Sequence, residues 1–209
     1  MTANLPPPAD PAIYHITHLD NLAGILRERG LWCDAQRIAR GFANTNIGHK
    51  HIKARRLARP VPTPPGGHLG DYVPFNFCPR SVMLYAVNRG HNDYGGGQTS
   101  VVHLVSSVKR AAALGRPWAF TDRHAELAHA LYYNDVKALV EVPWNTMAET
   151  YWKEVKEERQ AEFLVHQSFP WEGIAAIGVI SEPVKSQVEY LISGDTHRPK
   201  IVVKPEWYY

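Results

Sequence analysis

The apolar residues of this chain fall into short runs, and this pattern limits the fold more than any other feature of the sequence. Each of the six clearest runs is five or six residues long, which suits a strand and lies far below the roughly 18 apolar residues of a membrane-spanning helix. The runs lie at 13–17, 72–77, 100–105, 161–166, 175–180 and 200–204. Segments with helical spacing lie between them, so the sequence predicts an α+β domain with about six strands and five helices.

The predicted helices are marked by apolar spacing and by residues that start or end a helix. One helix covers 19–29 and stops at Gly30, and a basic helix covers 47–58. Further helices are expected over 79–89 and after Ser181, because serine is favoured at the position before a helix. Two polar or proline- and glycine-rich segments are expected to be irregular: 34–46 and 61–70.

The composition is that of a globular protein. The chain has 209 residues, of which 44% are hydrophobic and 21% charged. Residues 1–209 are therefore expected to form a single domain, with 1–12 as an extended, proline-rich lead-in. The N-terminal segment lacks the charged and apolar regions of a signal peptide, so the protein is expected to be cytoplasmic. Cys33 and Cys78 lie outside any C-x-x-C pattern, so we expect them to be buried rather than in a disulfide or a zinc site.

One segment carries a strongly uneven charge. No acidic residue lies between Asp34 and Asp71, whereas seven lysines and arginines do. They are Arg37, Arg40, Lys50, Lys53, Arg55, Arg56 and Arg59. Such a field suits phosphate groups and is typical of nucleic-acid or dinucleotide binding, while the alternative is a solvated basic face. Because acids are interspersed through the rest of the chain, binding is the favoured interpretation.

A single carboxylate interrupts one of the apolar runs. Glu162 lies near the start of the strand predicted over 161–166. A carboxylate buried in such a strand is unfavourable unless it is paired, solvated in a cleft or used in a reaction. The alternative is an edge-strand residue that faces water, and the sequence leaves both open.

His15 and Thr17 lie two positions apart in the first predicted strand, so their side chains point to the same face. Together they offer donors and acceptors that suit a ribose or a carboxamide, while the alternative is an ordinary hydrogen-bonded strand histidine. No third histidine, cysteine or carboxylate stands at a spacing that would complete a metal site, so no metal is expected. The sequence also lacks the G-x-x-x-x-G-K-[ST] phosphate loop and the G-x-S-x-G motif of serine hydrolases.

Taken together, five segments resemble the DarT family, the DNA ADP-ribosyltransferase toxins of bacterial toxin–antitoxin pairs. They are Ile13-Tyr-His-Ile-Thr-His18, His51-Ile-Lys-Ala-Arg-Arg56, Gly70-Asp-Tyr-Val-Pro-Phe75, Cys78-Pro-Arg-Ser-Val-Met-Leu-Tyr85 and Gln160-Ala-Glu-Phe-Leu-Val165. The resemblance implies an ADP-ribosyltransferase fold with a split mixed β-sheet and inserted helices. It also implies NAD⁺ as the consumed co-substrate, thymine in single-stranded DNA as the acceptor, and a DarG-like antitoxin with an ADP-ribose-removing macrodomain as partner.

The resemblance implies roles for residues on the donor side. Glu162 would be the catalytic glutamate, and His15 and Thr17 would hold the riboses of NAD⁺. Tyr85 would be the tyrosine of the nicotinamide pocket, with Tyr72 as a competing candidate.

On the acceptor side, the basic helix would supply an arginine that acts on the base. Arg55 is favoured for this catalytic role, with Arg56 and Lys53 as alternatives. Lys53, Arg56 and Arg59 would also bind the nucleic acid. Three aromatic residues before the glutamate would stack on bases: Trp144, Tyr151 and Trp152.

Two other functions stay open at this point. An NAD⁺-dependent transferase acting on RNA, such as a 2′-phosphotransferase, would use a similar donor pocket with a different acceptor. A non-catalytic nucleic-acid-binding module would need only the basic helix and exposed aromatic residues, with Glu162 at the surface.

Overall fold

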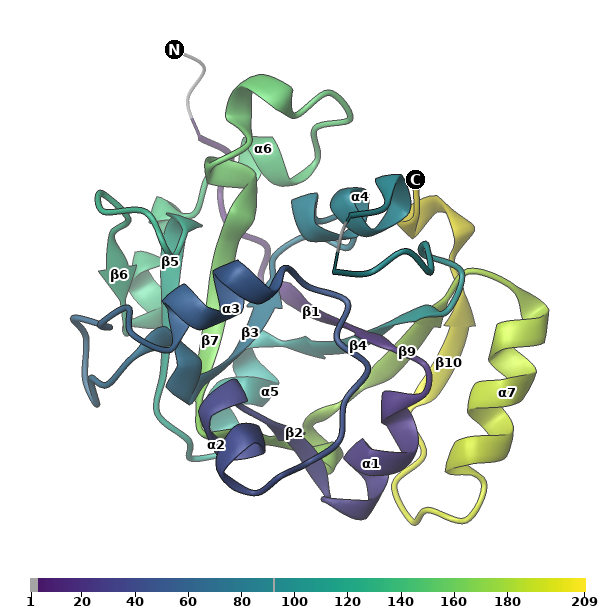
Figure 1. The fold of residues 1–209 in the computed structure, drawn as a ribbon. Helices are drawn as coiled ribbons and strands as arrows, with labels where there is room; N and C mark the ends of the chain where they lie inside the picture. The colour runs from purple at the N-terminus through teal and green to yellow at the C-terminus, as the bar shows by residue number, and fades with distance from the viewer. Residues whose placement is uncertain (1–3, 92) are drawn as a thin grey trace.

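An eight-stranded mixed β-sheet forms the centre of the protein, seen in a computed structural model that describes residues 4–91 and 93–209. In spatial order the strands are β10 (Lys200–Val203), β9 (Ala176–Val179), β4 (Val101–Ser107), β1 (Ala12–His18), β3 (Tyr72–Asn76), β7 (Ala161–His166), β5 (Trp118–His124) and β6 (Tyr132–Tyr133). β9 and β10 pair in parallel, and the other neighbours pair antiparallel. Strands from both halves of the chain therefore meet at the centre of the sheet (Figure 1).

The six predicted strands are all present, as β1, β3, β4, β7, β9 and β10, and the α+β class is confirmed. The sequence did not indicate β5 and β6, nor a separate two-stranded sheet of β2 (Gly30–Trp32) and β8 (Ser168–Pro170). The second half of β5 is polar, and β2, β6 and β8 have only two or three residues each. Such strands are too short or too polar to show an alternating pattern.

Four helices lie where the sequence predicts them: α1 (Asn21–Arg27), α3 (Lys50–Arg56), α4 (Val82–Arg89) and α7 (Glu182–Ile192). The expectation that 34–46 is irregular is wrong at its start, where α2 (Asp34–Ala39) lies. None of the residues of α2 is buried, so it has no apolar stripe to reveal it, and it begins instead with a hydrogen bond from the Gln36 N–H to the sulfur of Cys33.

Two further helices were not predicted, α5 (Val108–Ala113) and α6 (Trp144–Met147), and they have only six and four residues. Short 3-10 segments lie at Leu69–Asp71, Val136–Glu141, Lys153–Val155, Glu158–Gln160, Trp171–Gly173 and Pro205–Trp207.

Gly30 does more than end the first helix. Its φ angle of 144° lies outside the range that other residues adopt readily, and a Cβ atom there would collide with the carbonyl oxygen of Phe169 in β8. Glycine at this position therefore allows β2 and β8 to approach each other.

The main core lies between the sheet and the helices beside it. Ile13, Phe75, Leu104 and Phe163 are completely buried within it, and burial of each such side chain contributes about 1.5–3 kcal/mol. Figure 1 shows α7 beside β10, and α3 in front of β3 and β7. The two cysteines are buried and free, as predicted.

The described residues include no helix with the length and hydrophobicity needed to cross a membrane. The lead-in expected over 1–12 ends one residue earlier, at Pro11, because β1 begins at Ala12, and its residues 1–3 lie outside the described part.

Candidate active site

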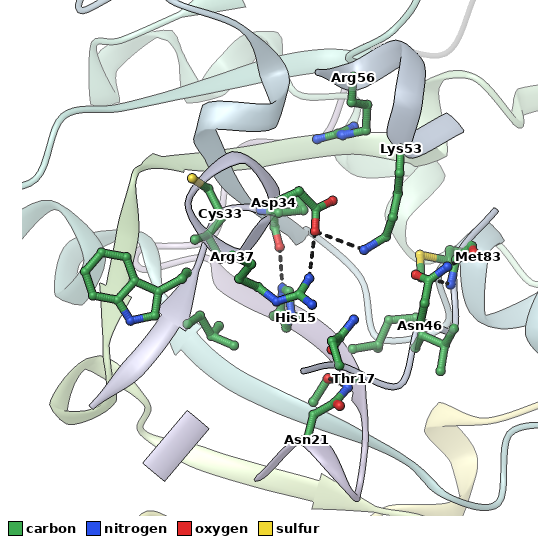
Figure 2. A pocket seen from close by; sticks show the side chains of 18 of the residues that line it. His15, Thr17, Asn21, Cys33, Asp34, Arg37, Asn46, Lys53, Arg56 and Met83 are labelled. Carbon is green, nitrogen blue, oxygen red and sulfur yellow. Dashed lines mark hydrogen bonds and ion pairs between the residues drawn. The ribbon is translucent and has the colours of Figure 1, made fainter. Parts of the chain in front are cut away.

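A cavity of about 350 Å³ opens beside the central strands. Its walls come from β1, α1, α2, α3, β7 and the segment 42–49, so residues from both halves of the chain face one space. Figure 2 shows His15, Lys53 and Arg56 among the side chains that line it. Glu162, His15, Thr17, Lys53 and Arg56, five of the residues singled out in the sequence, line it together.

Arg56 and Glu162 form an ion pair in this cavity. The guanidinium Nη1 and Nη2 donate to the carboxylate Oε1 and Oε2 at 3.0 and 2.8 Å. Their side chains are only 11% and 9% exposed. Burial alone would raise the pKa of Glu162, but the charge and hydrogen bonds of Arg56 outweigh it and hold that pKa below its usual range. Glu162 is therefore ionised, and the paired and buried alternative of the sequence analysis is the observed one.

The sheet is irregular next to Glu162. Phe120 pairs with Phe163 and His124 with Ala161, so three residues of β5 face the single residue Glu162 of β7. The hydroxyl of Thr121 accepts the backbone N–H of Glu162 at 3.0 Å, in place of a carbonyl of the regular ladder. This bulge leaves Glu162 and His124 together on the wall of the cavity.

His124 was not predicted as a site residue. Burial lowers its pKa, and Glu162 opposes this effect only in part, so the imidazole is neutral near pH 7. A neutral imidazole beside a carboxylate and a guanidinium can accept a proton from a bound substrate.

His15 presents one defined ring nitrogen to the cavity. Its Nδ1 lies 2.8 Å from the carbonyl oxygen of Pro74 and donates to it. Burial lowers the pKa of His15 to about 4, so Nε2 carries no proton and is left as an acceptor. A ribose hydroxyl or a carboxamide N–H is a suitable donor to this nitrogen.

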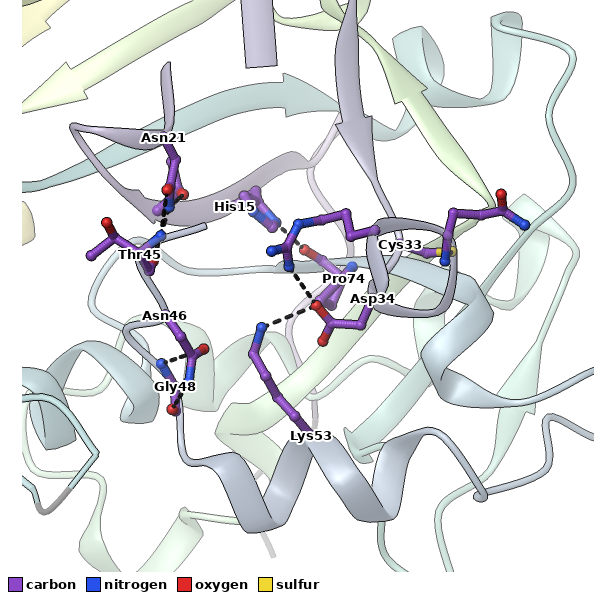
Figure 3. A network of polar contacts seen from close by, with 12 residues as sticks. His15, Asn21, Cys33, Asp34, Thr45, Asn46, Gly48, Lys53 and Pro74 are labelled. Carbon is purple, nitrogen blue, oxygen red and sulfur yellow. Dashed lines mark hydrogen bonds and ion pairs between the residues drawn. The ribbon is translucent and has the colours of Figure 1, made fainter. Parts of the chain in front are cut away.

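Asn21 connects β1 to the segment that borders the cavity. Its side-chain Nδ2 donates to the Thr17 hydroxyl and to the Thr45 carbonyl, each at 3.0 Å, and its Oδ1 accepts the Thr45 N–H at 2.8 Å. One amide thus fixes Thr17 and the chain near Thr45; Figure 3 shows the contact between Asn21 and Thr45. The sequence analysis did not single out Asn21, because the partners of its amide come from a distant segment.

Asp34 holds two cations inside the cavity. Its Oδ1 accepts from Arg37 Nη1 at 2.9 Å and from Lys53 Nζ at 3.0 Å, and Figure 2 shows both side chains converging on it. Burial tends to raise the pKa of Asp34, but the charge of Lys53 and Arg37 lowers it overall. Two cations with one carboxylate between them leave a net positive charge that suits a diphosphate.

The sequence of this chain matches a known protein family over nearly its whole length. The family profile described as "ssDNA thymidine ADP-ribosyltransferase, DarT" matches residues 14–209. The chain belongs to the DarT family. A "DNA ADP-ribosyl transferase" of Thermus aquaticus is 43% identical over 204 residues, which cover 97% of this chain and 90% of the relative.

Solved DarT structures have the same fold. Thermus sp. 2.9 DarT in complex with ADP-ribosylated ssDNA superposes with a TM-score of 0.93 at 41% identity, over 99% of this chain and 100% of that one. Thermus sp. 2.9 DarT in complex with NAD⁺ gives a TM-score of 0.87 at 40% identity, over 97% and 99% of the two chains. The predicted DarT resemblance and its ADP-ribosyltransferase fold are therefore confirmed.

Not all of the residues that the DarT resemblance suggested lie at the cavity. Arg55 neighbours Arg56 in α3 but is 60% exposed and forms a two-point ion pair with Glu126 at 2.7 and 2.8 Å. Arg59, beyond α3, donates to the carbonyl of Leu127 at 2.8 Å. The catalytic role suggested for Arg55 thus falls on an outward-facing side chain, while Arg56 points at Glu162.

The two tyrosines considered for the nicotinamide pocket are elsewhere in this DarT chain. Tyr72 is buried in a small cluster with Leu69 and Leu164, and its hydroxyl donates to the Gly66 carbonyl at 2.7 Å. Tyr85 is partly exposed and packs edge-on against Trp152 and Tyr209. Neither is among the residues that line the cavity.

The three aromatic residues suggested for base stacking differ in exposure. Tyr151 is 92% exposed, whereas Trp144 is buried and its indole N–H donates to the Leu139 carbonyl at 2.7 Å. Trp152 is partly buried beside Tyr85. Of the three, Tyr151 and Trp152 have ring surface that a base can reach.

Proposed function

We propose that this chain is an NAD⁺-dependent mono-ADP-ribosyltransferase that modifies thymine bases in single-stranded DNA. The observation that carries the proposal is the buried Arg56–Glu162 pair, which brings a fixed carboxylate and a guanidinium to one cavity in a member of the DarT family. In this reaction positive charge develops on the donor ribose and negative charge on the acceptor base. The carboxylate of the pair can stabilise the first and the guanidinium the second.

On the donor side, Glu162 acts on the ribose carbon that loses nicotinamide. As the bond to the nicotinamide nitrogen breaks, positive charge develops on that ribose, and a fixed carboxylate stabilises it. His15, through Nε2, and Thr17 hold ribose or carboxamide groups. Lys53, which the sequence assigned to nucleic acid, and Arg37 bind the diphosphate instead, because both cations lie inside the cavity.

On the acceptor side, Arg56 replaces Arg55 as the residue that acts on the base. A thymine ring nitrogen attacks the ribose carbon as its proton leaves, nicotinamide departs, and the positive charge of the guanidinium stabilises the developing thymine anion. The pair with Glu162 raises the pKa of Arg56 against the effect of burial, so Arg56 stays protonated and stabilises charge. His124, neutral and on the same wall, accepts the proton.

In this proposal the DNA strand approaches the cavity across basic and aromatic side chains outside it, of which Arg55 and Tyr151 are exposed and Arg59 and Trp152 half-buried. Arg55 and Arg59 supply positive charge to phosphates, and Tyr151 and Trp152 offer ring faces to bases. In this assignment Arg55 has a binding role and Trp144 a structural one.

We further propose that residues 1–209 act as one ADP-ribosyltransferase domain and as the toxin of a toxin–antitoxin pair. The partner is an antitoxin of the DarG kind, with a macrodomain that removes ADP-ribose. The proposed location is the cytoplasm, since NAD⁺ and DNA are both found there in bacteria.

The experiment that tests the function is mass spectrometry of short oligonucleotides after incubation with NAD⁺. We expect one ADP-ribose on a thymine-containing DNA strand, and none on a matched strand with every thymine replaced by cytosine. Glu162→Gln protein serves as the control for background. Modification of RNA but not of DNA would support the 2′-phosphotransferase-like alternative, and no NAD⁺ consumption with retained DNA binding would support the non-catalytic module.

A further inference from the structure

Three metal-ligating side chains meet near the start of α3. His49, His91 and Asp93 each offer one ligand atom, and these atoms all lie within 4.8 Å of one another. His49 directly precedes α3, while His91 and Asp93 lie in the turn after α4. The sequence expectation of no metal considered spacing along the chain, which cannot detect ligands that two separate segments bring together.

His91 has the ring geometry of a metal ligand. Its Nε2 lies 3.1 Å from the carbonyl oxygen of Ile47 and donates to it, so Nδ1 carries the lone pair. Nδ1 is buried and has no hydrogen-bond partner among the described residues. Metal-binding histidines usually donate the other ring N–H to a carbonyl or carboxylate, as His91 does, and a buried nitrogen without a partner is otherwise unfavourable.

The other two ligands lie close to the His91 ring and to each other. The rings of His49 and His91 lie 4.0 Å apart between centroids, and His49 Nδ1 is 3.9 Å from Asp93 Oδ2. Asp93 Oδ2 also accepts the Lys50 backbone N–H at 3.0 Å, which orients its carboxylate.

We propose that His49, His91 and Asp93 bind a zinc ion. Two imidazoles and one carboxylate suit Zn²⁺ better than Mg²⁺, which prefers an all-oxygen shell. Three protein ligands leave a fourth position for water. The bound ion connects the N-terminal end of α3 to the turn after α4.

This connection has a consequence for the cavity. α3 carries Lys53 and Arg56 into it, and His49 itself contributes to its wall. A zinc ion that fixes His49, the residue directly before α3, therefore restrains the helix from which these cations project. The ion takes no part in the chemistry of the proposed transfer, and zinc binding can be measured without DNA or NAD⁺.

Calorimetric titration of metal-free protein with ZnCl₂, after removal of any histidine tag, tests the site. We expect one Zn²⁺ per chain for the wild type. His91→Ala and Asp93→Asn should each weaken binding by at least about 10-fold, as ligand and neighbouring-shell losses do. Asp93→Asn keeps an oxygen that can accept the Lys50 N–H, so it guards against loss of fold. His129→Ala is the matched control, since His129 lies 3.2 Å from Glu157 in a histidine–carboxylate pair elsewhere, and should bind zinc as the wild type does.

Thermal unfolding gives a second readout. Zn²⁺ should raise the Tm of the wild type and of His129→Ala, and should leave the Tm of His91→Ala unchanged, while Mg²⁺ should shift none of them. The proposal is overturned if the wild type binds no zinc, or if His91→Ala and Asp93→Asn, folded by their Tm without metal, bind it as tightly as the wild type.

Discussion

Arg56 holds both carboxylate oxygens of Glu162 although 106 positions separate the two residues in the chain. The helix α3 and the strand β7 thereby present opposite charges to one cavity, and each charge keeps the other ionised in a buried place. A substrate that enters must share or separate this pair. The effects of changing either residue are therefore coupled.

Glu162→Gln should reduce ADP-ribose transfer by at least about 100-fold, because fixed charge that stabilises a transition state is typically worth this much or more. The mutant should also be less stable. Loss of one partner from a buried ion pair costs about 3–5 kcal/mol, so Tm must be measured beside the transfer rate. A folded mutant with near wild-type turnover would remove Glu162 from the mechanism.

Arg56→Ala and Arg55→Ala form a matched pair of neighbours in α3. At saturating oligonucleotide, we expect Arg56→Ala to lose transfer to DNA and Arg55→Ala to keep most of it, because only Arg56 contacts Glu162. Arg56→Lys keeps the charge but cannot form the two-point contact and should also be poor.

The same variants separate the donor and acceptor roles. Calorimetry with NAD⁺ should give similar affinity for Arg55→Ala and the wild type. If instead Arg55→Ala abolishes transfer while Arg56→Ala retains it, the original sequence preference for Arg55 is the better one.

The sequence could not show whether Arg55 or Arg56 faces the cavity. Side chains of adjacent helical residues point about 100° apart. Because α3 has no buried residue, the sequence contains no apolar stripe that would show which side of the helix faces the protein. Glu162 was easier to recognise, because a carboxylate in an apolar strand is unusual by itself. His124 was not recognised, since it follows a polar stretch and reaches the cavity only through the irregular pairing of β5.

Hydrogen bonds between distant segments at the cavity could not be predicted from the sequence either. Asn21 looks like an ordinary polar residue at the start of a helix until Thr45 is seen opposite it. The six predicted strands, by contrast, could be recognised because each contains a short run of mostly apolar residues.

DNA binding should weaken steeply with salt. With Glu162→Gln protein, the log of the association constant for a single strand should fall against log salt with a slope of about −0.7 for each phosphate contacted. If Arg55 contacts one DNA phosphate as proposed, Arg55→Ala in the Glu162→Gln protein should make the slope less negative by about 0.7. A slope near zero would mean that the basic helix does not contact phosphates and is a solvated basic face.

Stability should fall as the pH drops from about 6.5 toward about 4. Burial lowers the pKa of both His15 and His103 from 6.5 to about 4, so in this window the unfolded chain binds more protons than the folded one. The free energy of unfolding therefore rises with pH through the window and levels off above it. Each histidine can contribute up to roughly 3 kcal/mol.

Chemical denaturation at several pH values measures this slope. His103→Gln keeps an amide donor for the Pro79 carbonyl, which His103 Nε2 contacts at 3.0 Å, but it cannot titrate. The variant should show a shallower dependence, and an unchanged slope would exclude His103 as a source.

The bulge of β5 makes the length of this strand matter more than its composition. Three residues, 121–123, occupy the space opposite Glu162. Deletion of a single one would shift His124 by one position and turn its side chain to the other face of the sheet, because strand residues alternate. Point substitutions at Asp122 or Arg123 leave that register intact. Among natural variants of this enzyme, insertions and deletions of one residue in 121–123 should therefore be eliminated, and Thr121, whose hydroxyl accepts the Glu162 N–H, should be retained.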